Sequence, residues 1–491
     1  MEILVNLTAI VVVVLLFNFM IFIHELGHFL AAKWRGLEVE KFYIWFGKPI
    51  WKKTINGVEY GIGSIPAGGY VALPQMAPME AIEGGDSERR KQLPPIKPID
   101  KIIVAFAGPL FSFLLAFAAA CAVWIFGKPA DTVHSTVVGY VEAGSPAEKS
   151  GIQLGDEITE VDGVAVKRFL GGLDGLSENI MLSKNKSVEI TLQRDGVEKT
   201  VTSTFLIDKT SWWERRAMRR IGVGYSDPLV IDEIEKESPA ALAGFQPGDR
   251  VESLNGEKLY SVPQMSDLLK ENIGQKVTLM VTRGDEKLAL YVASMVPNDK
   301  MTGKPHPDGR AMIGAKFETA FDLSLVNPSP GEQVKEGLLL MLTTLQAIAA
   351  KNSNIDIQHL SGPVGIGHAM FGFIRTDEAL RRILWFMVVL NINLAIMNML
   401  PLPVLDGGHI VLAIGEQVAG RPVKLRVLEI IQTGFVIVLL SLFAYITSKD
   451  IGGLFPGAKE EPWGLHGVVW PAIESAVSAP DGGSNEETPS L

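Results

Sequence analysis

Residues 3–28 read ILVNLTAIVVVVLLFNFMIFIHELGH, an apolar run that ends in a cluster of ionisable side chains. The part from Ile3 to Ile23 carries no charge and is long enough to cross a bilayer as one helix. A secretory signal peptide would have basic residues before the run and a cleavage site after it, whereas the only charge before this run is Glu2. The stretch therefore predicts a membrane span with polar chemistry at its end.

The composition agrees with a membrane protein that carries a soluble part. Of 491 residues, 47% are hydrophobic and only 20% are charged, which excludes disorder for most of the chain. The net charge of −10 argues against nucleic acid as a partner. The single cysteine, Cys121, excludes an intramolecular disulfide and any site built from several thiolates, and we assign it to packing within an apolar stretch.

Three further apolar stretches predict three more spans, at Ile102–Gly127, Ile383–Leu405 and Ile430–Ser448. Basic residues cluster between the first two spans and again between the last two, where they include Arg421, Lys424 and Arg426. Loops rich in lysine and arginine stay in the cytoplasm, so these two loops are expected there. The segment from Lys128 to Arg382 and both termini are then expected on the outer side.

The long segment between the second and third spans contains an internal repeat. One copy has SPAEKSGIQLGD at 145–156 and the other has SPAALAGFQPGD at 238–249, each followed by an apolar strand and an Asp-Gly or Asn-Gly turn. The pattern resembles PDZ domains of the circularly permuted bacterial type, which bind a peptide or chain terminus by strand addition. The alternative is a pair of β-rich spacers. Between the copies, Trp212 and Trp213 begin an arginine-rich segment that is either a docking patch or a linker.

The quoted stretch ends in His24-Glu25-Leu26-Gly27-His28, the HExxH pattern. Positions i and i+4 share a face of a helix, so both imidazoles can bind one Zn²⁺. Glu25 lies beside them and can take a proton from water and pass it to a leaving amine. A polar helix end at the membrane surface is the weaker alternative, because ionisable residues within membrane spans are costly and usually functional.

A catalytic zinc site needs a third protein ligand. The third span contains NMLPLPVLDGGH at 398–409, where Pro401 and Pro403 break the helix at membrane depth. Irregular backbone at this depth is tolerated only inside protein or beside a water-filled cavity. Asp406 and His409 are both candidate third ligands in this break.

Together, HExxH in the first span and NxxPxPxLDGG in the third resemble the site-2 protease family of intramembrane zinc metalloproteases, over roughly residues 1–450. The resemblance implies a polytopic α-helical membrane protein with four transmembrane helices, a membrane-associated β-hairpin and two β-rich PDZ domains. It implies that the zinc ligands are His24, His28 and Asp406, with Asp406 in preference to His409. It also implies that Glu25 is the catalytic base and that Asn398 and Asn393 contact the substrate.

The resemblance also implies a location and a substrate class. The enzyme is expected in the inner membrane, with its active site toward the cytoplasm and its PDZ domains in the periplasm. Substrates would be single-span membrane proteins, such as an anti-sigma factor already trimmed outside, and remnant signal peptides, and the PDZ pair would admit only those with short external parts. A PDZ adaptor without catalysis would need neither HExxH nor Asp406, and a metal transporter would show paired broken helices, whereas only one span here is broken.

A peptide bond in a helix is protected from attack, so a substrate span must unwind and still pair its backbone. An edge strand beside the zinc would provide such pairing by strand addition. The candidate is Val58–Val71, within a hairpin at about residues 55–72, in which Gly68, Gly69 and Tyr70 would contact the substrate.

These segments predict the following organisation. Residues 1–127 hold the first two spans and the hairpin, 128–210 and 211–300 the two PDZ domains, 301–382 a connector with an amphipathic helix, 383–450 the last two spans, and 451–491 a flexible tail.

Overall fold

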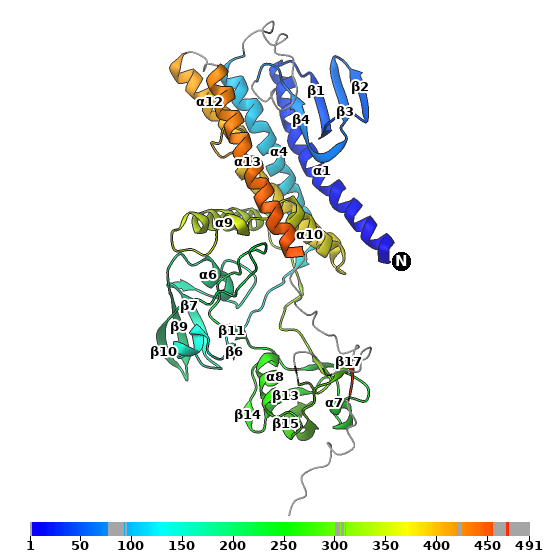
Figure 1. Cartoon of the computed structure of the whole chain (residues 1–491), viewed down its shortest axis with the longest axis vertical. Helices are drawn as coiled ribbons and strands as arrows, with labels where there is room; N and C mark the ends of the chain where they lie inside the picture. Colours follow the sequence, from blue (N-terminus) through cyan, green and yellow to red (C-terminus); the bar gives the residue numbers. More distant parts are fainter. Residues whose placement is uncertain are drawn as a thin grey trace, which may run out of the picture.

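The computed structural model describes residues 2–76, 93, 96–299, 305, 309, 311–420, 425–454 and 468–470. Within this part of the chain, a bundle of long helices occupies one end and two β-rich units lie beyond the other end of the bundle (Figure 1). Four of the described helices are long and apolar enough to cross a membrane, over Asn6–Arg35, Pro98–Phe126, Ala379–Asn398 and Ile430–Gly453. The prediction of four spans is confirmed.

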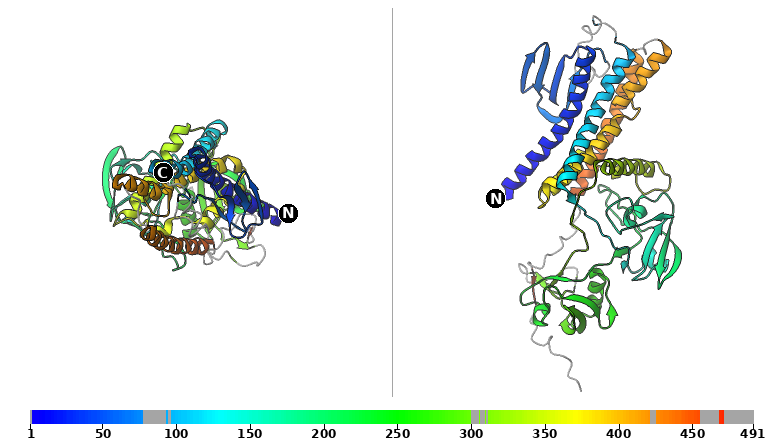
Figure 2. Two further views of the ribbon diagram at one scale, coloured as in Figure 1. Left: turned by 90° about the horizontal axis from the view of Figure 1, so that it is seen from above. Right: turned by 180° about the vertical axis from the view of Figure 1, so that it is seen from behind.

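Helix α4 (Pro98–Phe126) is the centre of the bundle. It packs against α1 (Glu2–Arg35), α11 (Ala379–Asn398) and α12 (Asp406–Ala419). Its buried face is rich in small residues, namely Ala105, Ala107, Gly108, Ser112, Ala116, Ala119 and Ala120. Small side chains let helix backbones approach closely, which is how membrane helices associate without a hydrophobic driving force. Helix α13 (Leu425–Leu454) lies on the outside of this group and exposes most of its apolar side chains (Figure 2).

The first helix continues past the charge-free stretch to Arg35, so the HExxH residues lie on it, as the sequence predicts. One helix boundary differs from that expected. The third span ends at Asn398 rather than at Leu405, because Pro401 disfavours a helical conformation at the preceding residue and removes a backbone donor. The chain then turns and begins a separate helix, α12, that the sequence did not predict.

The loop between the first two spans forms a four-stranded sheet beside α1. Its strands are β1 (Lys41–Phe46), β2 (Trp51–Ile55), β3 (Val58–Ile62) and β4 (Ile65–Ala72), in the order β2-β3-β1-β4. The predicted hairpin at 55–72 therefore differs in detail: the hairpin joins β2 to β3 through Asn56-Gly57, and β4 pairs antiparallel with β1. The strand Lys41–Phe46, which the sequence reading overlooked, inserts between β3 and β4 and leaves β4 at the edge.

The two β-rich units share one topology, as the sequence repeat predicted. The first has β6 (Val138–Val141), α5 (Pro146–Lys149), β7 (Glu157–Val161), β8 (Val164–Ala165), α6 (Leu176–Leu182), β9 (Val188–Arg194), β10 (Val197–Ser203) and β11 (Val223–Tyr225). The second has β12 (Ile231–Ile234), α7 (Pro239–Leu242), β13 (Arg250–Leu254), β14 (Glu257–Lys258), α8 (Val262–Glu271), β15 (Lys276–Arg283), β16 (Glu286–Ala293) and β18 (Ala315–Phe317). Their sheets, β10-β9-β7-β8 and β16-β15-β13-β14, correspond strand by strand.

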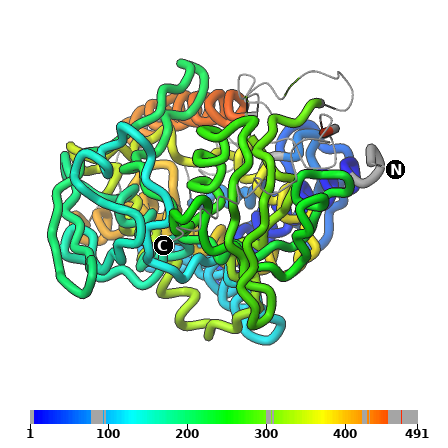
Figure 3. Tube along the Cα trace, turned by 90° about the horizontal axis from the view of Figure 1, so that it is seen from below, coloured from blue at the N-terminus to red at the C-terminus, as the bar shows by residue number. Residues whose placement is uncertain are grey.

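The boundary between these two repeats lies later than residues 210 and 211. The core of the first repeat extends to Ile221 and includes Tyr225, because β11 pairs with β6. The core of the second repeat begins at Leu229 and includes β18, which the sequence reading placed in the connector. The repeats touch through the Tyr140 hydroxyl, which donates to Asp267. Figure 3 shows the molecule from the end at which the repeats lie.

The connector and tail also contribute defined elements. The connector contains β19 (Leu325–Val326), α9 (Pro330–Ala349), a 3-10 turn (Ile357–His359) and α10 (Pro363–Ile374). Of the predicted flexible tail, α13 continues to Leu454, and β20 (Val468–Val469) pairs with β17 (Asn298–Asp299) beside the second repeat. Apart from Trp470, the rest of 451–491 lies outside the described residues.

The Gly-Asp pair of each repeat has a structural explanation. In the second repeat, the Asp249 carboxylate is buried and accepts two hydrogen bonds from Arg283 and one from the backbone N–H of Gln246. In the first repeat, Asp156 accepts the same set from Arg194 and Gln153. Each arginine thus ties the strand after the Gly-Asp turn to the second hairpin of its repeat.

We expect Asp249→Asn to destabilise the second repeat by about 3 kcal/mol, because it leaves the Arg283 guanidinium without its charge partner. Hydrogen exchange of the β13 and β15 amides in the full chain measures this loss, and Asp285→Asn in the exposed neighbouring turn is the matched control. Although burial raises it, the pKa of Asp249 is lowered overall by Arg283 and the Gln246 N–H. The wild-type advantage should therefore be full above the ordinary value of 3.8 and shrink as the pH falls below it. Equal exchange in both variants at neutral pH would contradict the assignment.

Candidate active site

Two buried histidines of α1 form the first part of the site. His24 and His28 are one helical turn apart, and their Nε2 atoms lie 3.3 Å from each other. Nδ1 of His28 donates to the carbonyl oxygen of Val104, and Nδ1 of His24 lies 2.9 Å from the hydroxyl of Ser112. Because α4 engages the Nδ1 atoms, the Nε2 atoms of both rings are directed to one point.

Asp406 completes this point from the other side of the bundle. It is the first residue of α12, and its carboxylate oxygens lie 3.3 Å from His24 Nε2 and 3.4 Å from His28 Nε2. The turn that delivers it is very tight: a Cβ on Gly407 would lie 2.3 Å from the Met399 carbonyl oxygen, and one on Gly408 would lie 2.0 Å from that of Leu402. The two glycines are therefore required for the backbone to fold back toward α1.

The three donors have the spacing of a tetrahedral zinc site. All three ligand atoms lie within 4.8 Å of one another, and no other such group was found among the described residues. In a tetrahedron with metal–ligand distances of about 2.1 Å, neighbouring donors are about 3.4 Å apart, close to the separations seen here. Two imidazole nitrogens and one carboxylate are also the donor set of many catalytic zinc sites, with the fourth position open. The residues present thus fit Zn²⁺.

A cavity of about 330 Å³ lies beside these three side chains. The predicted site residues that line it are His24, Glu25, His28, Gly68, Gly69, Tyr70, Asn398 and Asp406. Asn393 is half-buried on α11 and is not among the residues that line it. His409 lines the cavity, and its Nε2 is buried without a hydrogen-bond partner in the described part of the chain.

Glu25 and Asn398 lie where they can act on a molecule in the cavity. Asn398 Nδ2 is 3.4 Å from His24 Nε2, next to the point where the three donors meet. Glu25 follows His24 in α1 and lines the cavity together with Gly69 and Val71 of β4. Its side chain therefore lies beside both the edge strand and the three donors.

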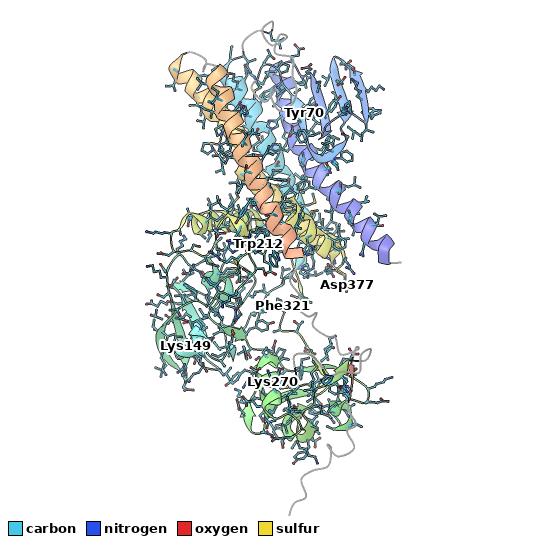
Figure 4. All side chains as sticks on the ribbon, in the orientation of Figure 1. Tyr70, Lys149, Trp212, Lys270, Phe321 and Asp377 are labelled. Carbon is cyan, nitrogen blue, oxygen red and sulfur yellow. The ribbon has the colours of Figure 1, made fainter. Side chains whose placement is uncertain are left out.

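The free edge of β4 faces the same cavity. Residues 68–74, which include most of β4, line it, and a Cβ on Gly69 would lie 3.6 Å from the Glu25 side chain. The Ala72 carbonyl oxygen accepts the Glu40 N–H on the β1 side of β4. Backbone groups of a strand alternate in direction, so the N–H groups of Gly69 and Val71 point to the unpaired edge. Tyr70 stacks on Phe46 of β1, which holds the strand in place beside α1 (Figure 4).

Sequence reasoning missed the residues that support the histidines. Ser112 and the Val104 carbonyl carry no motif, so only the structure identifies them. Gly108, which precedes Pro109 in the second span, also supports the site, because a Cβ there would lie 2.1 Å from His28 Nε2. Glycine at this position is what allows the imidazole to pack against α4.

Comparison with known proteins gives one consistent answer. The model described as peptidase family M50 matches residues 12–442. Protease RseP of Yersinia pestis is 30% identical over 87% of this chain and 94% of that protein. A predicted zinc metalloprotease of Vibrio cholerae is also 30% identical, over 84% of this chain and 94% of its own length. Regulator of sigma-E protease RseP of Escherichia coli is 28% identical, over 83% and 90%.

Proposed function

Because the chain belongs to peptidase family M50, the site-2 proteases, we propose that His24, His28 and Asp406 hold its catalytic zinc and that Glu25 is the general base. The chain is a zinc metalloprotease of the inner membrane that acts in intramembrane proteolysis. The observation that carries the residue assignment is the meeting of three zinc-type donors beside Glu25 in one cavity of the helix bundle.

The chemistry of peptide hydrolysis assigns a role to each side chain. Bound zinc supplies a Lewis acid that polarises the scissile carbonyl and makes water more acidic. Glu25 takes the proton of the attacking water and delivers it to the leaving nitrogen. Asn398, with its Nδ2 next to the ligands, donates a hydrogen bond to the oxygen on which negative charge develops. Asn393 stands further from the cavity, so its contact with substrate would lie along the bound segment rather than at the cut.

The edge strand solves the problem of a helical substrate. A transmembrane segment must lose helical hydrogen bonds before its peptide bond can be attacked, and each lost bond is costly away from water. The outward N–H groups of Gly69 and Val71 offer replacement donors to the carbonyl oxygens of the substrate beside Glu25. Gly68, Gly69 and Tyr70 would thus bind the unwound segment as an added strand.

The two repeats would act as a size filter on the outer side. They lie at the end of the bundle opposite the β1–β4 sheet (Figure 1). Basic residues in the sequence of that sheet and between α12 and α13 support a cytoplasmic position for this end and a periplasmic position for the repeats. Single-span proteins with short external parts, such as a trimmed anti-sigma factor or a remnant signal peptide, would pass this filter. By the same PDZ resemblance, the repeats would also bind a peptide or a chain terminus by strand addition.

Glu25→Gln is expected to lower cleavage of a single-span substrate in membranes at least about a hundredfold, because the base is lost while the zinc ligands are intact. Bound zinc, measured by elemental analysis of the purified protein, should stay at the wild-type level. His28→Ala should lose both zinc and activity. Glu38→Gln, outside the cavity, is the matched control for the glutamate change. Full activity of Glu25→Gln would contradict the role of this residue as base.

Gly68→Ala is expected to slow cleavage roughly tenfold or more, with zinc retained, because a small displacement of a positioning strand is costly to catalysis. Gly68 has φ +100°, and a Cβ there would lie 2.5 Å from the Phe46 ring, so β4 must shift. Gly57→Ala is the control: Gly57 also has a positive φ, of +82°, but its Cβ would meet open space in the β2–β3 turn. Equal rates for the two variants would remove the argument for strand addition at β4.

The filter can be tested by excising both repeats. β5 (Lys128–Pro129) pairs antiparallel with β19 (Leu325–Val326), so the two ends of the insertion are adjacent and a short Gly-Ser turn can join Pro129 to Leu325. We expect the wild type to cleave only substrates with short external parts and the excised variant to cleave those with a folded external domain as well. Cleavage of the short substrate by both proteins controls for folding. Unchanged selectivity would contradict a gating role.

A further inference from the structure

The segment between β10 and β11 exposes two adjacent tryptophans. The side chain of Trp212 is 84% exposed and that of Trp213 is 43% exposed. Their rings meet edge to face, with centroids 5.7 Å apart. Large aromatic side chains dominate the burial energy of folded proteins, so an exposed pair points to an environment other than water.

The backbone of this pair is fixed to the outer end of a membrane-spanning helix. Lys449 Nζ in α13 donates to the carbonyl oxygens of Trp212 and Glu214. A Cβ on Gly452 would lie 2.1 Å from the Trp213 carbonyl oxygen, which shows how closely the segment approaches the last turns of α13. The apolar span of this helix is Ile430–Gly453, so these contacts lie at its very end.

A buried ion pair holds the segment at that level. Arg215 pairs with Asp450, whose side chain is fully buried, and also donates to the carbonyl oxygen of Leu360. Asp450 in turn accepts the backbone N–H of Gly365 at the start of α10. The tryptophans therefore cannot drift away from the end of α13 without breaking a buried charge contact.

The end of a membrane span marks the interface between lipid chains and headgroups. Tryptophan is enriched at this depth because its ring is apolar and its N–H can bond water or headgroups. Helix α9 lies across the same end of the bundle and exposes Leu338, Leu339 and Leu342 (Figure 2). Figure 4 shows Trp212 at the level of α9 and of the end of α13.

We propose that Trp212 and Trp213 insert into the interfacial region of the outer lipid leaflet and dock the first repeat on the bilayer. The lipid bilayer is favoured over a protein partner because the tryptophan pair lies against the last turns of α13, where apolar side chains are exposed on several faces of the helix, among them Phe443, Tyr445 and Ile451. This attachment would keep the first repeat against the membrane, and it does not depend on the protease assignment.

The test places a fluorescent probe on the segment in the full chain. Trp212→Cys in a Cys121→Ala background is labelled with an environment-sensitive fluorophore and reconstituted into vesicles of phosphatidylcholine and phosphatidylglycerol. Lipids with a nitroxide near the headgroup are expected to quench this probe several-fold more than the same probe at Val197→Cys. Val197 is the matched control, since it is apolar, 57% exposed and on β10 of the same repeat.

Two results would overturn the proposal. One is quenching at position 212 that is no stronger than at position 197, which would mean that the pair faces water or a protein. The other is stronger quenching by a nitroxide deep in the lipid chains than by one near the headgroup, which would exclude an interfacial position. Retained zinc content and substrate cleavage in both labelled variants show that the protein is intact, and a loss of cleavage alone would bear on the active site and not on the docking surface.

Discussion

The contact between the two α1 histidines and the Asp406 carboxylate is the constraint on which the rest of the structure depends. Placing three ionisable groups inside an apolar helix bundle is costly unless each is fully engaged. The bundle meets this requirement by holding each Nδ1 from α4 and by directing both Nε2 atoms at the carboxylate. That geometry demands a glycine at 108, a helix that stops at Asn398 and a tight turn at Gly407 and Gly408.

The sequence predicted the fold class and which polar side chains come together, but not the helix boundaries or the sheet order around them. HExxH and the Asp406 motif are local patterns whose chemistry follows from residue type and spacing, so the three donors could be named before their geometry was known. Span boundaries were harder, because apolar residues continue beyond the helix end at Asn398 and polar residues begin before the helix end at Arg35. The order of the strands in the sheet could not be predicted, because nothing in Lys41–Phe46 indicates that this strand lies between β3 and β4.

The same contrast between local and non-local information applies to the two repeats. Their Gly-Asp turns and arginine-bearing hairpins are local signals, and the structure joins each pair by one bidentate contact. The strand that completes each repeat, β11 or β18, comes after a long irregular segment and pairs back over a large sequence distance. Such pairing has no periodic signature in a segment of three residues, which is why the boundaries at 210 and 300 fell too early.

Asp450 connects the soluble half of the molecule with the membrane half. Its buried carboxylate accepts hydrogen bonds from Arg215 of the first repeat and from the N–H of Gly365. Gly365 belongs to the segment Ser361-Gly-Pro-Val-Gly365, in which α10 begins. A Cβ on Gly362 or Gly365 would lie 2.9 or 2.8 Å from this carboxylate, which accounts for both glycines of that segment. Three elements therefore share one charge: the end of α13, the start of α10 and the arginine-rich segment of the first repeat. Helix α13 packs chiefly against α10 and the 3-10 turn, and α10 packs against α1 and α11. Asp450 therefore links the first repeat, through α10, to the helices that carry His24, His28 and Asn398.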